Sequence, residues 1–270
     1  MKQVLSIQDL SCVGKCSLTV ALPVLSAMGC VCTPLPTGIL SSHTAFPNPH
    51  IRSLTEDIGP TCRHWQEIGA SFDMISVGYL SDPQQANAVS RVLDAFPSRV
   101  VLDPVLGDNG SCYRGIGEDH IAAMRQLCQK ANILLPNVTE AALLTGLSYC
   151  QNAGLDYCQN LIDGLKVFGA NGLVITGVSL SPDTVGFVGW EEDEIFSYQT
   201  PKCPSQSHGT GDLFAAVLTG AMAKGESLQQ AAKLAADFVF RVLSATKEPS
   251  PFGADFEKQL PFLWERSKNS

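Results

Sequence analysis

Short apolar runs rich in β-branched residues alternate with longer segments of helical character along most of the chain. The runs at 72–77, 99–102, 132–135 and 172–176 are apolar on both faces and are closed by turn residues. Strands of this kind are typical of the buried centre of a parallel sheet, whose crossovers are helices. We therefore expect an α/β fold with a central, mostly parallel sheet flanked by helices. The segments that predict the helices are 52–69, 83–96, 118–130, 139–144 and 155–168.

The two ends of the chain complete this pattern. A first strand is predicted at 3–8 and an apolar helix at 17–28, which ends at Gly29. Two strands at 185–190 and 194–199 are joined by an acidic turn, which predicts a small antiparallel hairpin late in the chain. Helices at 211–224 and 227–245 follow. No repeat or linker divides the sequence, so we expect a single domain over residues 1–270.

Charge and cysteine content exclude several classes of protein. The chain carries 26 acidic against 18 basic residues, which argues against a nucleic-acid-binding surface. No apolar run reaches the roughly 20 residues of a membrane helix. The first residues become polar before a signal-peptide core could form. We expect a cytoplasmic protein with neither nucleic-acid nor membrane partners. The 10 cysteines include no Cys-x-x-Cys pair, so a structural zinc site is not expected.

The strongest local motif is His208-Gly209-Thr210-Gly211-Asp212, directly followed by an apolar helix. Glycines before a helix let main-chain N–H groups converge on an anion, and the helix dipole adds positive potential. Asp212 beside such a phosphate cradle suits a general base that takes a proton from an attacking hydroxyl. The alternative is that Asp212 only caps the helix and the glycines only turn the chain.

Other polar segments follow predicted strands, where open α/β sheets bind ligands. Asp9-Leu10-Ser11 forms a polar turn after the first strand and could hold a ligand or cap the next helix. Asp103 and Asp108 follow a later strand and could hold a cation or shape a phosphate site, or belong to an ordinary turn.

Two further segments allow a structural and a functional interpretation. Asn137 and Glu140 have the spacing of a helix N-cap with its acidic partner, and Glu140 could also orient Mg²⁺. The segment from Ser42 to Thr44 and the residue Tyr79 offer hydroxyl and aromatic groups that could line a pocket for a flat heteroaromatic substrate.

In this order, the motifs resemble the ribokinase-like superfamily, specifically its branch of pyridoxal and hydroxymethylpyrimidine kinases. The matching segments lie between residue 4 and about residue 240. The resemblance implies ATP-dependent phosphorylation of the 5′-hydroxymethyl group of a B6 vitamer, namely pyridoxal, pyridoxine or pyridoxamine. The alternatives are a hydroxymethylpyrimidine kinase of thiamine synthesis and a catalytically silent vitamer-binding protein. The matching segments are Val4–Gln8, Ser42–Thr44, Gly78-Tyr79, Asp103–Asp108, Pro136–Gly146, Thr176-Gly177 and Gly209–Asp212.

The resemblance also implies a role for each site residue, with ATP as co-substrate, Mg²⁺ as cofactor and a homodimeric assembly. Asp212 would be the base, and Gly209, Thr210 and Gly211 would form the anion hole for the transferring phosphoryl group. The vitamer ring would contact Asp9, Ser11, Thr44 and Tyr79. The ATP site would comprise Asp103, Asn137, Thr176 and Gly177, with the segment 201–208 beside it. Glu140 and Asp108 would hold the metal ion.

Departures from the family pattern leave some points open. The loop from Asp9 to Gly14 is shorter than in pyridoxal kinases, so either Asp9 or Ser11 could contact the ring. Leu135 stands where the family often has threonine near a monovalent cation, so K⁺ activation is undecided. The cysteines also divide into two groups. Cys128, Cys150 and Cys158 are expected to pack in the interior, whereas Cys12, Cys16, Cys112 and Cys203 border the expected site.

Overall fold

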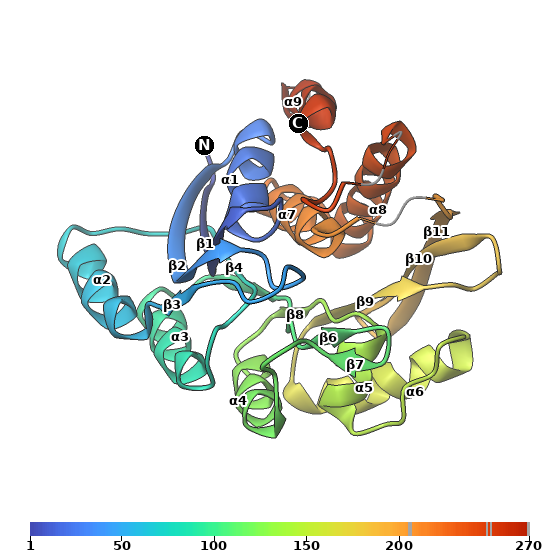
Figure 1. Cartoon of the computed structure of the whole chain (residues 1–270), viewed down its shortest axis with the longest axis horizontal. Coiled ribbons are helices and arrows are strands. Elements are labelled where there is room, and N and C mark those ends of the chain that lie inside the picture. The colour runs from blue at the N-terminus through green and yellow to red at the C-terminus, as the bar shows by residue number, and fades with distance from the viewer. Residues whose placement is uncertain (205–206, 247, 249, 269–270) are drawn as a thin grey trace.

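The computed structural model describes residues 1–204, 207–246, 248 and 250–268. It contains a nine-stranded sheet with the strand order β11-β10-β9-β8-β5-β4-β1-β2-β3 and a two-stranded sheet of β6 and β7 (Figure 1). In chain order the elements are β1 (Gln3–Val13), α1 (Leu18–Ala27), β2 (Val31–Ser42), β3 (Ile51–Ser53), α2 (Thr55–Glu67), β4 (Met74–Val77), α3 (Gln84–Ala95), β5 (Arg99–Leu102), β6 (Gly107–Asp108), β7 (Ser111–Cys112), α4 (Glu118–Cys128), β8 (Ile133–Leu134), α5 (Val138–Thr145), α6 (Leu155–Leu165), the 3₁₀ helix η1 (Lys166–Phe168), β9 (Gly172–Val178), β10 (Thr184–Glu191), β11 (Glu194–Pro201), α7 (Thr210–Ala223), α8 (Leu228–Ala245), the 3₁₀ helix η2 (Glu257–Gln259) and α9 (Leu260–Lys268).

The middle of the large sheet is parallel, as the apolar runs predicted. The strands β2, β1, β4, β5, β8 and β9 run in one direction. The hairpin of β10 and β11 joins antiparallel to β9, and the short β3 joins antiparallel to β2 at the opposite edge. The expected α/β class, the mostly parallel sheet and the late hairpin are thereby confirmed. Because parallel strands end at the same edge, the loops after them converge there.

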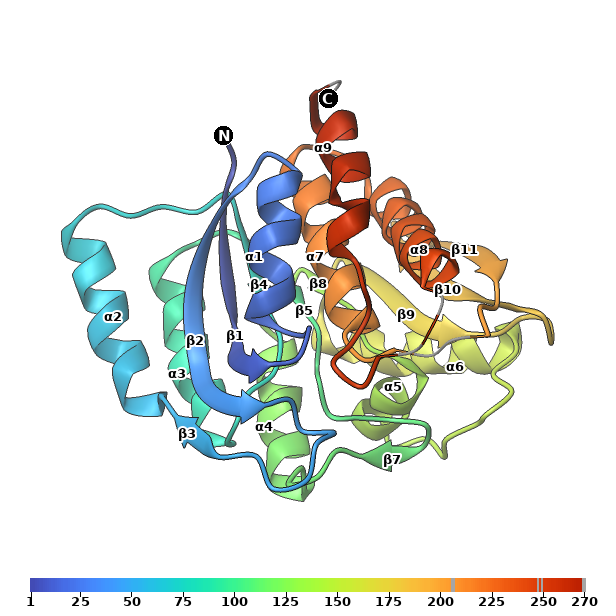
Figure 2. The same ribbon diagram turned by 45° about the horizontal axis from the view of Figure 1, so that its top comes forward.

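Helices cover both faces of the sheet, and the alternation of side chains along each strand supplies both cores. Val4 of β1 and Met74 of β4 pack with α1, α7, α8 and α9, whereas their neighbours Leu5 and Ile75 pack with α2 to α6. Figure 2 shows α1, α7, α8 and α9 together on one side of the strands. Burial on both faces explains why these strands are apolar throughout rather than alternating.

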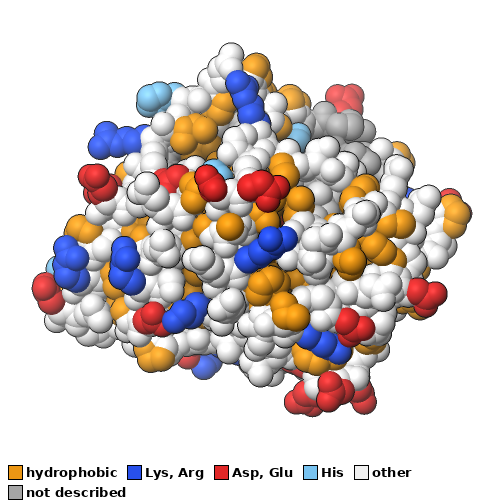
Figure 3. All heavy atoms as spheres, turned by 90° about the horizontal axis from the view of Figure 1, so that it is seen from below, with side chains coloured by type: hydrophobic (Ala, Val, Ile, Leu, Met, Phe, Trp, Pro, Cys, Tyr) orange, Lys and Arg blue, Asp and Glu red, His pale blue; other side chains and the backbone are white. Residues whose placement is uncertain are grey.

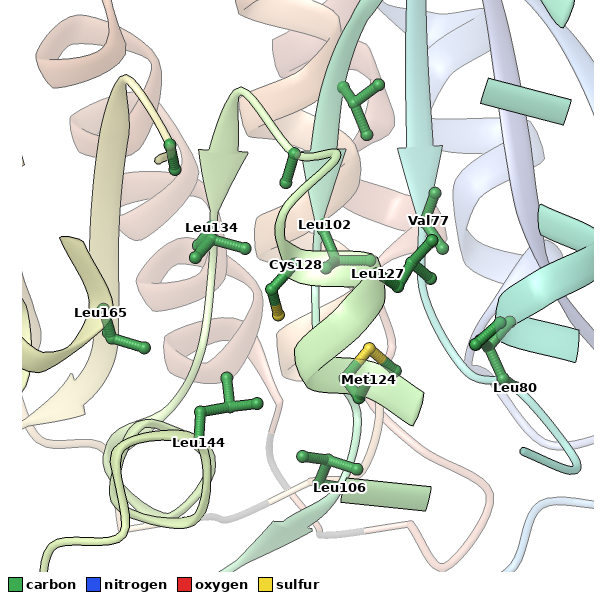
Figure 4. Close-up of a cluster of buried hydrophobic side chains, with 14 of the residues drawn as sticks. Val77, Leu80, Leu102, Leu106, Met124, Leu127, Cys128, Leu134, Leu144 and Leu165 are labelled. Atoms are coloured by element: carbon green, nitrogen blue, oxygen red, sulfur yellow. The ribbon is translucent and has the colours of Figure 1, made fainter. Parts of the chain in front are cut away.

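The core beneath α4 contains one of the cysteines that were expected to pack in the interior (Figure 4). Cys128 at the end of α4 is fully buried and lies near Leu127, Leu102 of β5 and Leu134 of β8. Cys158 of α6 is equally buried, so the predicted packing role is confirmed for both residues. Cys150 is only partly buried.

The first strand is longer than predicted, and the expected turn at Asp9-Leu10-Ser11 was wrong. These residues belong to β1, which continues to Val13 by pairing with β2 beyond an irregularity between Gln8 and Leu10. The polar side chains do not end the strand because they bond to each other, with the Ser11 hydroxyl donating to Asp9 Oδ2 at 2.8 Å. Neither residue caps α1, since its N-cap is Ser17.

One helix boundary and several whole elements also differ from the predictions. The helix expected from residue 52 begins at Thr55, because Ile51–Ser53 forms β3 and pairs with β2. The strand β2, the helix α9 and the small sheet of β6 and β7 were not predicted at all. Strands as short as β6 and β7 have no periodicity for a sequence pattern to reveal.

The surface carries charges of both signs. On the face shown in Figure 3, Lys and Arg side chains lie interspersed with Asp and Glu side chains. Within the described part of the chain, no helix combines the length and the apolar character needed to cross a bilayer.

The late hairpin is anchored by Phe187, which gives a test of this packing. Phe187 of β10 is fully buried, and its ring centroid lies 6.0 Å from that of Phe196, 6.2 Å from Tyr198 and 6.0 Å from Phe214 of α7. We expect Phe187→Ala to lower the free energy of unfolding by about 3–5 kcal/mol, because it leaves a cavity between hairpin and helix. Urea denaturation measures this loss.

Ile195 provides the matched control for that experiment. It lies on β11 of the same hairpin but is 44% exposed, so Ile195→Ala should cost less than about 1 kcal/mol. Equal losses for the two variants would contradict the anchoring role of Phe187.

Candidate active site

A cavity of about 380 Å³ opens at the edge of the sheet where the parallel strands end. One end of the cavity is polar and is lined by residues that follow β5, β8 and β9 and by the start of α7. The other end is apolar and is lined by Val239, Phe240 and Leu243 of α8 together with Val185 and Gly186 of β10. A flat aromatic group fits an apolar wall of this kind, and a charged group fits the polar end.

The glycine motif forms the floor of the polar end. Gly209 adopts a left-handed conformation with φ of 82°, and a Cβ there would come within 2.0 Å of the Lys15 carbonyl oxygen. Only glycine permits this approach. Thr210 begins α7, whose first main-chain N–H groups have no partners within the helix and face the cavity region lined by Gly209, Thr210 and Gly211. The geometry is that of an anion site at a helix N-terminus.

Asp212 lies in the first turn of α7 and also lines the cavity. Burial raises the pKa of its carboxyl from 3.8 to about 7, although the nearby main-chain N–H of Ser17 opposes the shift. The negative charge of Asp9 adds to the increase in pKa. A carboxylate with a pKa near neutrality, placed beside an anion site, can accept a proton from an attacking hydroxyl.

Glu140 is almost fully buried and has the structural role that its spacing to Asn137 predicted. The Asn137 side chain accepts from the Glu140 N–H at 3.0 Å, and Glu140 Oε2 accepts from the Asn137 N–H at 2.8 Å. Glu140 Oε1 accepts from the Leu106 N–H at 3.1 Å, which ties the loop after β5 to α5. Even so, Glu140 lines the cavity, so the cap and the site coincide.

The carboxyl groups at the polar end interact with one another. Burial raises the pKa of Glu140 to about 7, in spite of its N–H donors, and Asp108 contributes to the shift. Burial, with smaller contributions from Glu140 and Asp212, raises the pKa of Asp103 well above its ordinary range. Asp108 is exposed at the cavity wall, where its carboxylate accepts from the Asn109 N–H at 2.8 Å. A cation or a proton is therefore stabilised at this end.

The residues expected on the ATP side also reach the cavity. Asn137 and Thr176 form an isolated bridge between the segments after β8 and within β9, and both line the cavity with Gly177. The Asn137 amide donates to the Gly107 carbonyl at 2.8 Å, which holds the small β6 loop at the rim. Of the segment 201–208, the residues Pro201, Cys203, Ser207 and His208 line the cavity, whereas 205 and 206 lie outside the described residues.

The residues expected at the vitamer ring lie outside the cavity wall. Asp9 and Ser11 are buried, and Thr44 and Tyr79 are partly buried. Burial, followed by the negative charge of Asp9, raises the pKa of Tyr79, which places these two side chains near each other. Asp9 in turn influences Asp212. The structure thus places Asp9 near Ser11, Tyr79 and Asp212, and of these four residues only Asp212 lines the cavity.

The four cysteines expected near the site separate in the structure. Cys203 lines the cavity, with its Sγ 3.5 Å from the Ser244 hydroxyl. Cys16 lies near Asp212 and Asp9, and burial together with these two charges raises the pKa of its thiol to about 12. Cys12 and Cys112 are exposed. A thiol with so high a pKa is a poor nucleophile, so Cys16 is not a reactive group at neutral pH.

A segment near the C-terminus fastens the loop before α1, and the sequence analysis missed it. The Lys15 N–H donates to the Phe252 carbonyl at 2.7 Å, and the Lys15 ammonium pairs with Asp255 and, at 2.9 Å, with Glu257. The Ala254 N–H donates to the His208 carbonyl at 3.2 Å, directly before the glycine motif. No local pattern could reveal these contacts, because Lys15 and Asp255 are 240 positions apart.

Aromatic rings add to the contact between this C-terminal segment and the loops beside the glycine motif. The His43 ring lies 4.9 Å from that of His208 and 4.6 Å from that of Phe46, and Phe46 lies 5.6 Å from Phe252. His43 is therefore a packed loop residue, with its Nε2 3.0 Å from the Pro251 carbonyl oxygen. Within the described residues, no three His, Cys, Asp or Glu side chains are arranged as a complete metal cage.

Comparison with known proteins identifies the family. The model of the phosphomethylpyrimidine kinase family matches residues 26–254. The pyridoxal kinase of Lactobacillus plantarum has 31% identity and a TM-score of 0.91, with 100% of this chain and 99% of that chain covered. A Bacteroides thetaiotaomicron protein crystallised with pyridoxal has 33% identity and a TM-score of 0.92, with 97% and 95% covered. The pyridoxine/pyridoxal/pyridoxamine kinase of Bordetella bronchiseptica is 28% identical over 91% of this chain and 89% of its own length.

These similarities extend over nearly the whole chain and confirm the resemblance to the pyridoxal and hydroxymethylpyrimidine kinase branch of the ribokinase-like superfamily. The family match runs from α1 to the segment beyond α8 and includes the cavity and the glycine motif. The chain belongs to the phosphomethylpyrimidine kinase family.

Proposed function

We propose that this protein transfers the γ-phosphoryl group of ATP to the 5′-hydroxymethyl group of a B6 vitamer. The observation that carries this proposal is Asp212, a carboxyl with a pKa of about 7 at the anion-binding start of α7. A base and a phosphate cradle side by side are what a kinase for a neutral hydroxyl requires. The names of the relatives support the vitamer as the acceptor.

The proposed reaction uses the side chains at the polar end in sequence. Asp212 takes the proton from the hydroxymethyl group, and the freed oxygen forms a bond to the γ-phosphorus. The bond from this phosphorus to the bridging oxygen of ATP breaks, and ADP leaves. The N–H groups of Gly209, Thr210 and Gly211 stabilise the charge on the transferring group, as preorganised donors do in other phosphoryl transfers.

The nucleotide is proposed to lie along the length of the cavity. Its base would occupy the apolar end beside Val239 and Leu243, and its phosphates would extend past Thr176 and Gly177 toward α7. Asn137, which follows β8 and lines the cavity, would help to hold the phosphates in this position. Asp103, whose high pKa favours the protonated form, can donate a hydrogen bond to a phosphate oxygen.

The carboxyl groups of the polar end fit Mg²⁺. This ion prefers oxygen ligands and is usually held by one or two carboxylates, by water and by phosphates, so a complete protein cage is not needed. Burial is the main cause of the raised pKa of Asp103 and of Glu140, with further contributions from Glu140 and Asp212 at Asp103 and from Asp108 at Glu140, and a cation at this end would offset that cost of ionisation. Asp108 and Glu140 would hold the ion or its waters, and Mg²⁺ when bound neutralises charge on the phosphates.

The proposal also takes over several expectations of the resemblance. The vitamer ring would contact Asp9 or Ser11, together with Thr44 and Tyr79, on the side of Asp212 opposite the nucleotide. The protein would act as a homodimer and a single domain in the cytoplasm. Leu135 is buried at the end of β8, and a K⁺ requirement stays undecided.

A substrate panel decides between this proposal and its alternatives. We expect ADP release with at least one of pyridoxal, pyridoxine and pyridoxamine in the presence of MgATP, measured by a coupled assay with and without K⁺. Turnover of hydroxymethylpyrimidine but of none of the vitamers would support the second candidate, which the family description favours. Binding of pyridoxal without any turnover would indicate a silent binding protein.

Replacement of the proposed base gives a second test. We expect Asp212→Asn to lower kcat by about 10²–10⁴-fold, because the amide cannot accept the proton, while pyridoxal binding persists. The matched control is Asp119→Asn, which changes an exposed aspartate in the first turn of α4. The control should keep wild-type turnover. Unchanged turnover in Asp212→Asn would remove Asp212 from the mechanism.

The pKa of Asp212 predicts the pH dependence. Asp212 accepts a proton only when it is ionised, and its pKa lies at about 7 rather than 3.8. The value of kcat should therefore rise with pH up to about 7 and level off above it. A profile measured from pH 5.5 to 8.5 checks this expectation, and a flat profile over that range would contradict it. The same shift means that ionisation of Asp212 costs stability as pH rises through 7.

A further inference from the structure

The chain between α8 and α9 passes beside the start of α7 and the loop that follows β1 (Figure 2). In this connection, the segment 250–257 makes one main-chain hydrogen bond to each of these two neighbours. The Phe252 carbonyl accepts from the Lys15 N–H at 2.7 Å, and the Ala254 N–H donates to the His208 carbonyl at 3.2 Å. The segment 250–257 therefore bridges the loop after β1 and the glycine motif.

The hydrogen bond to His208 controls the direction of an N–H group at the start of α7. The His208 carbonyl and the Gly209 N–H belong to the same peptide group, which is planar and trans, so they point in opposite directions. A donor that holds the carbonyl oxygen therefore also fixes where the Gly209 N–H points. Because Ala254 is that donor, the Gly209 N–H is turned away from the segment 250–257.

Gly253 lies between the two bonded residues, at a place where no side chain fits. Its φ is 112°, which residues other than glycine rarely adopt. An added Cβ would lie 3.0 Å from the Lys15 carbonyl oxygen and 3.2 Å from the His208 carbonyl oxygen. The Lys15 oxygen is the same atom that Gly209 approaches. A side chain at position 253 would thus press on two carbonyl groups, one that adjoins Gly209 and one that contacts it.

The same segment is held both in the interior and at the surface. Ala254 and Phe256 are buried in the core that α1, α7 and α8 also form. At the surface, the Lys15 ammonium pairs with Asp255 and, at 2.9 Å, with Glu257. Exposed ion pairs contribute little to the free energy of folding. Their effect here is to limit the movement of the segment relative to the loop after β1.

We propose that the segment 250–257 positions the anion hole, with Gly253 and Lys15 as its positioning residues. Its main chain holds the peptide group before Gly209, so that the Gly209 N–H points toward the transferring phosphoryl group. Gly253 permits the close approach, and Lys15 joins the segment to the loop against which Gly209 packs. This inference rests on the proposed function, since it concerns the N–H groups that would stabilise the phosphoryl transfer.

Gly253→Ala tests this inference, and Gly225 at the other end of α7 provides the matched control. We expect Gly253→Ala to lower kcat by about 10–100-fold, with the KM for ATP unchanged within about 2-fold, because a displaced donor weakens binding of the transition state more than of the ground state. Gly225 has a φ of 97°, and apart from its chain neighbours no described atom lies within 4 Å of the position of an added Cβ. Gly225→Ala therefore strains the backbone without pressing on a neighbour.

Both glycine variants should have a lower Tm than the wild type, because alanine is strained at a positive φ. Only Gly253→Ala should lose turnover. Wild-type kcat in Gly253→Ala, or an equal loss of kcat in Gly225→Ala, would show that the segment 250–257 stabilises the fold without positioning the anion hole.

Lys15→Met is a milder variant that leaves the main chain unstrained. Methionine keeps an apolar stem but cannot pair with either acidic partner. We expect kcat to fall about 3–10-fold in Lys15→Met and to recover in Lys15→Arg, which keeps the positive charge. The control is Lys2→Met, which breaks the 2.9 Å ion pair with Asp73 at the start of β1 and should keep wild-type kcat. Wild-type kcat in Lys15→Met would contradict the proposal, including in the case that Gly253→Ala does not fold.

A structural readout separates this inference from the proposed function. A crystal structure of Gly253→Ala, or of Lys15→Met if the former does not fold, should show the peptide plane before Gly209 turned by more than about 20°, a measurement that needs no turnover. An unmoved peptide plane overturns the positioning role. Wild-type protein that phosphorylates none of the three vitamers contradicts the proposed function instead, whichever orientation this peptide adopts in the variant.

Discussion

Parallel strands bring the loops that follow them to one edge of a sheet, and in this protein those loops carry carboxyl groups. Asp103, Glu140 and Asp212 meet at the polar end of the cavity, and Asp9 lies near Asp212. Burial raises the pKa of each one, so the ionised forms are costly in the folded protein. Other groups of the site offset the free-energy cost of ionising these carboxyl groups.

Main-chain N–H groups provide much of the compensation. Glu140 accepts from the N–H groups of Leu106 and Asn137, and the nearby Ser17 N–H opposes the increase in the pKa of Asp212. These donors belong to loops that the sheet and helices hold rigidly, so they stabilise charge and fix geometry together. A bound cation or a transferred proton would neutralise the negative charge that these donors leave uncompensated. The buried carboxyl groups that destabilise the fold are thus those that the proposed phosphoryl transfer uses.

The glycine motif depends on parts of the chain that are distant in sequence. Gly209 approaches the carbonyl of Lys15, and Lys15 is fastened to the segment that contains Phe252 and Asp255. The beginning of the chain and its last fifth therefore hold the cradle between them. This arrangement explains why a short motif that recurs by chance becomes a site only in this fold.

Several predictions from sequence agree with the structure because they depend on local patterns. The apolar strands β5 and β9, the glycine-led start of α7 and the capping pair of Asn137 and Glu140 are all of this kind. In the last case the structural and the functional interpretation do not compete, since the capped Glu140 also faces the cavity. The predicted turn at Asp9 failed because pairing with β2 overrides local polarity.

The sequence by itself therefore determined the α/β class, most of the strands of the large sheet with the helices between them, and the motif that holds Asp212. These depend on apolar periodicity and on glycine, whose physical effects act within a few residues. Only the tertiary structure decided that Asp9 lies near Asp212 and that Lys15 reaches Asp255. Contacts between residues so far apart are set by how helices and strands pack, and no local pattern in a single sequence records that packing.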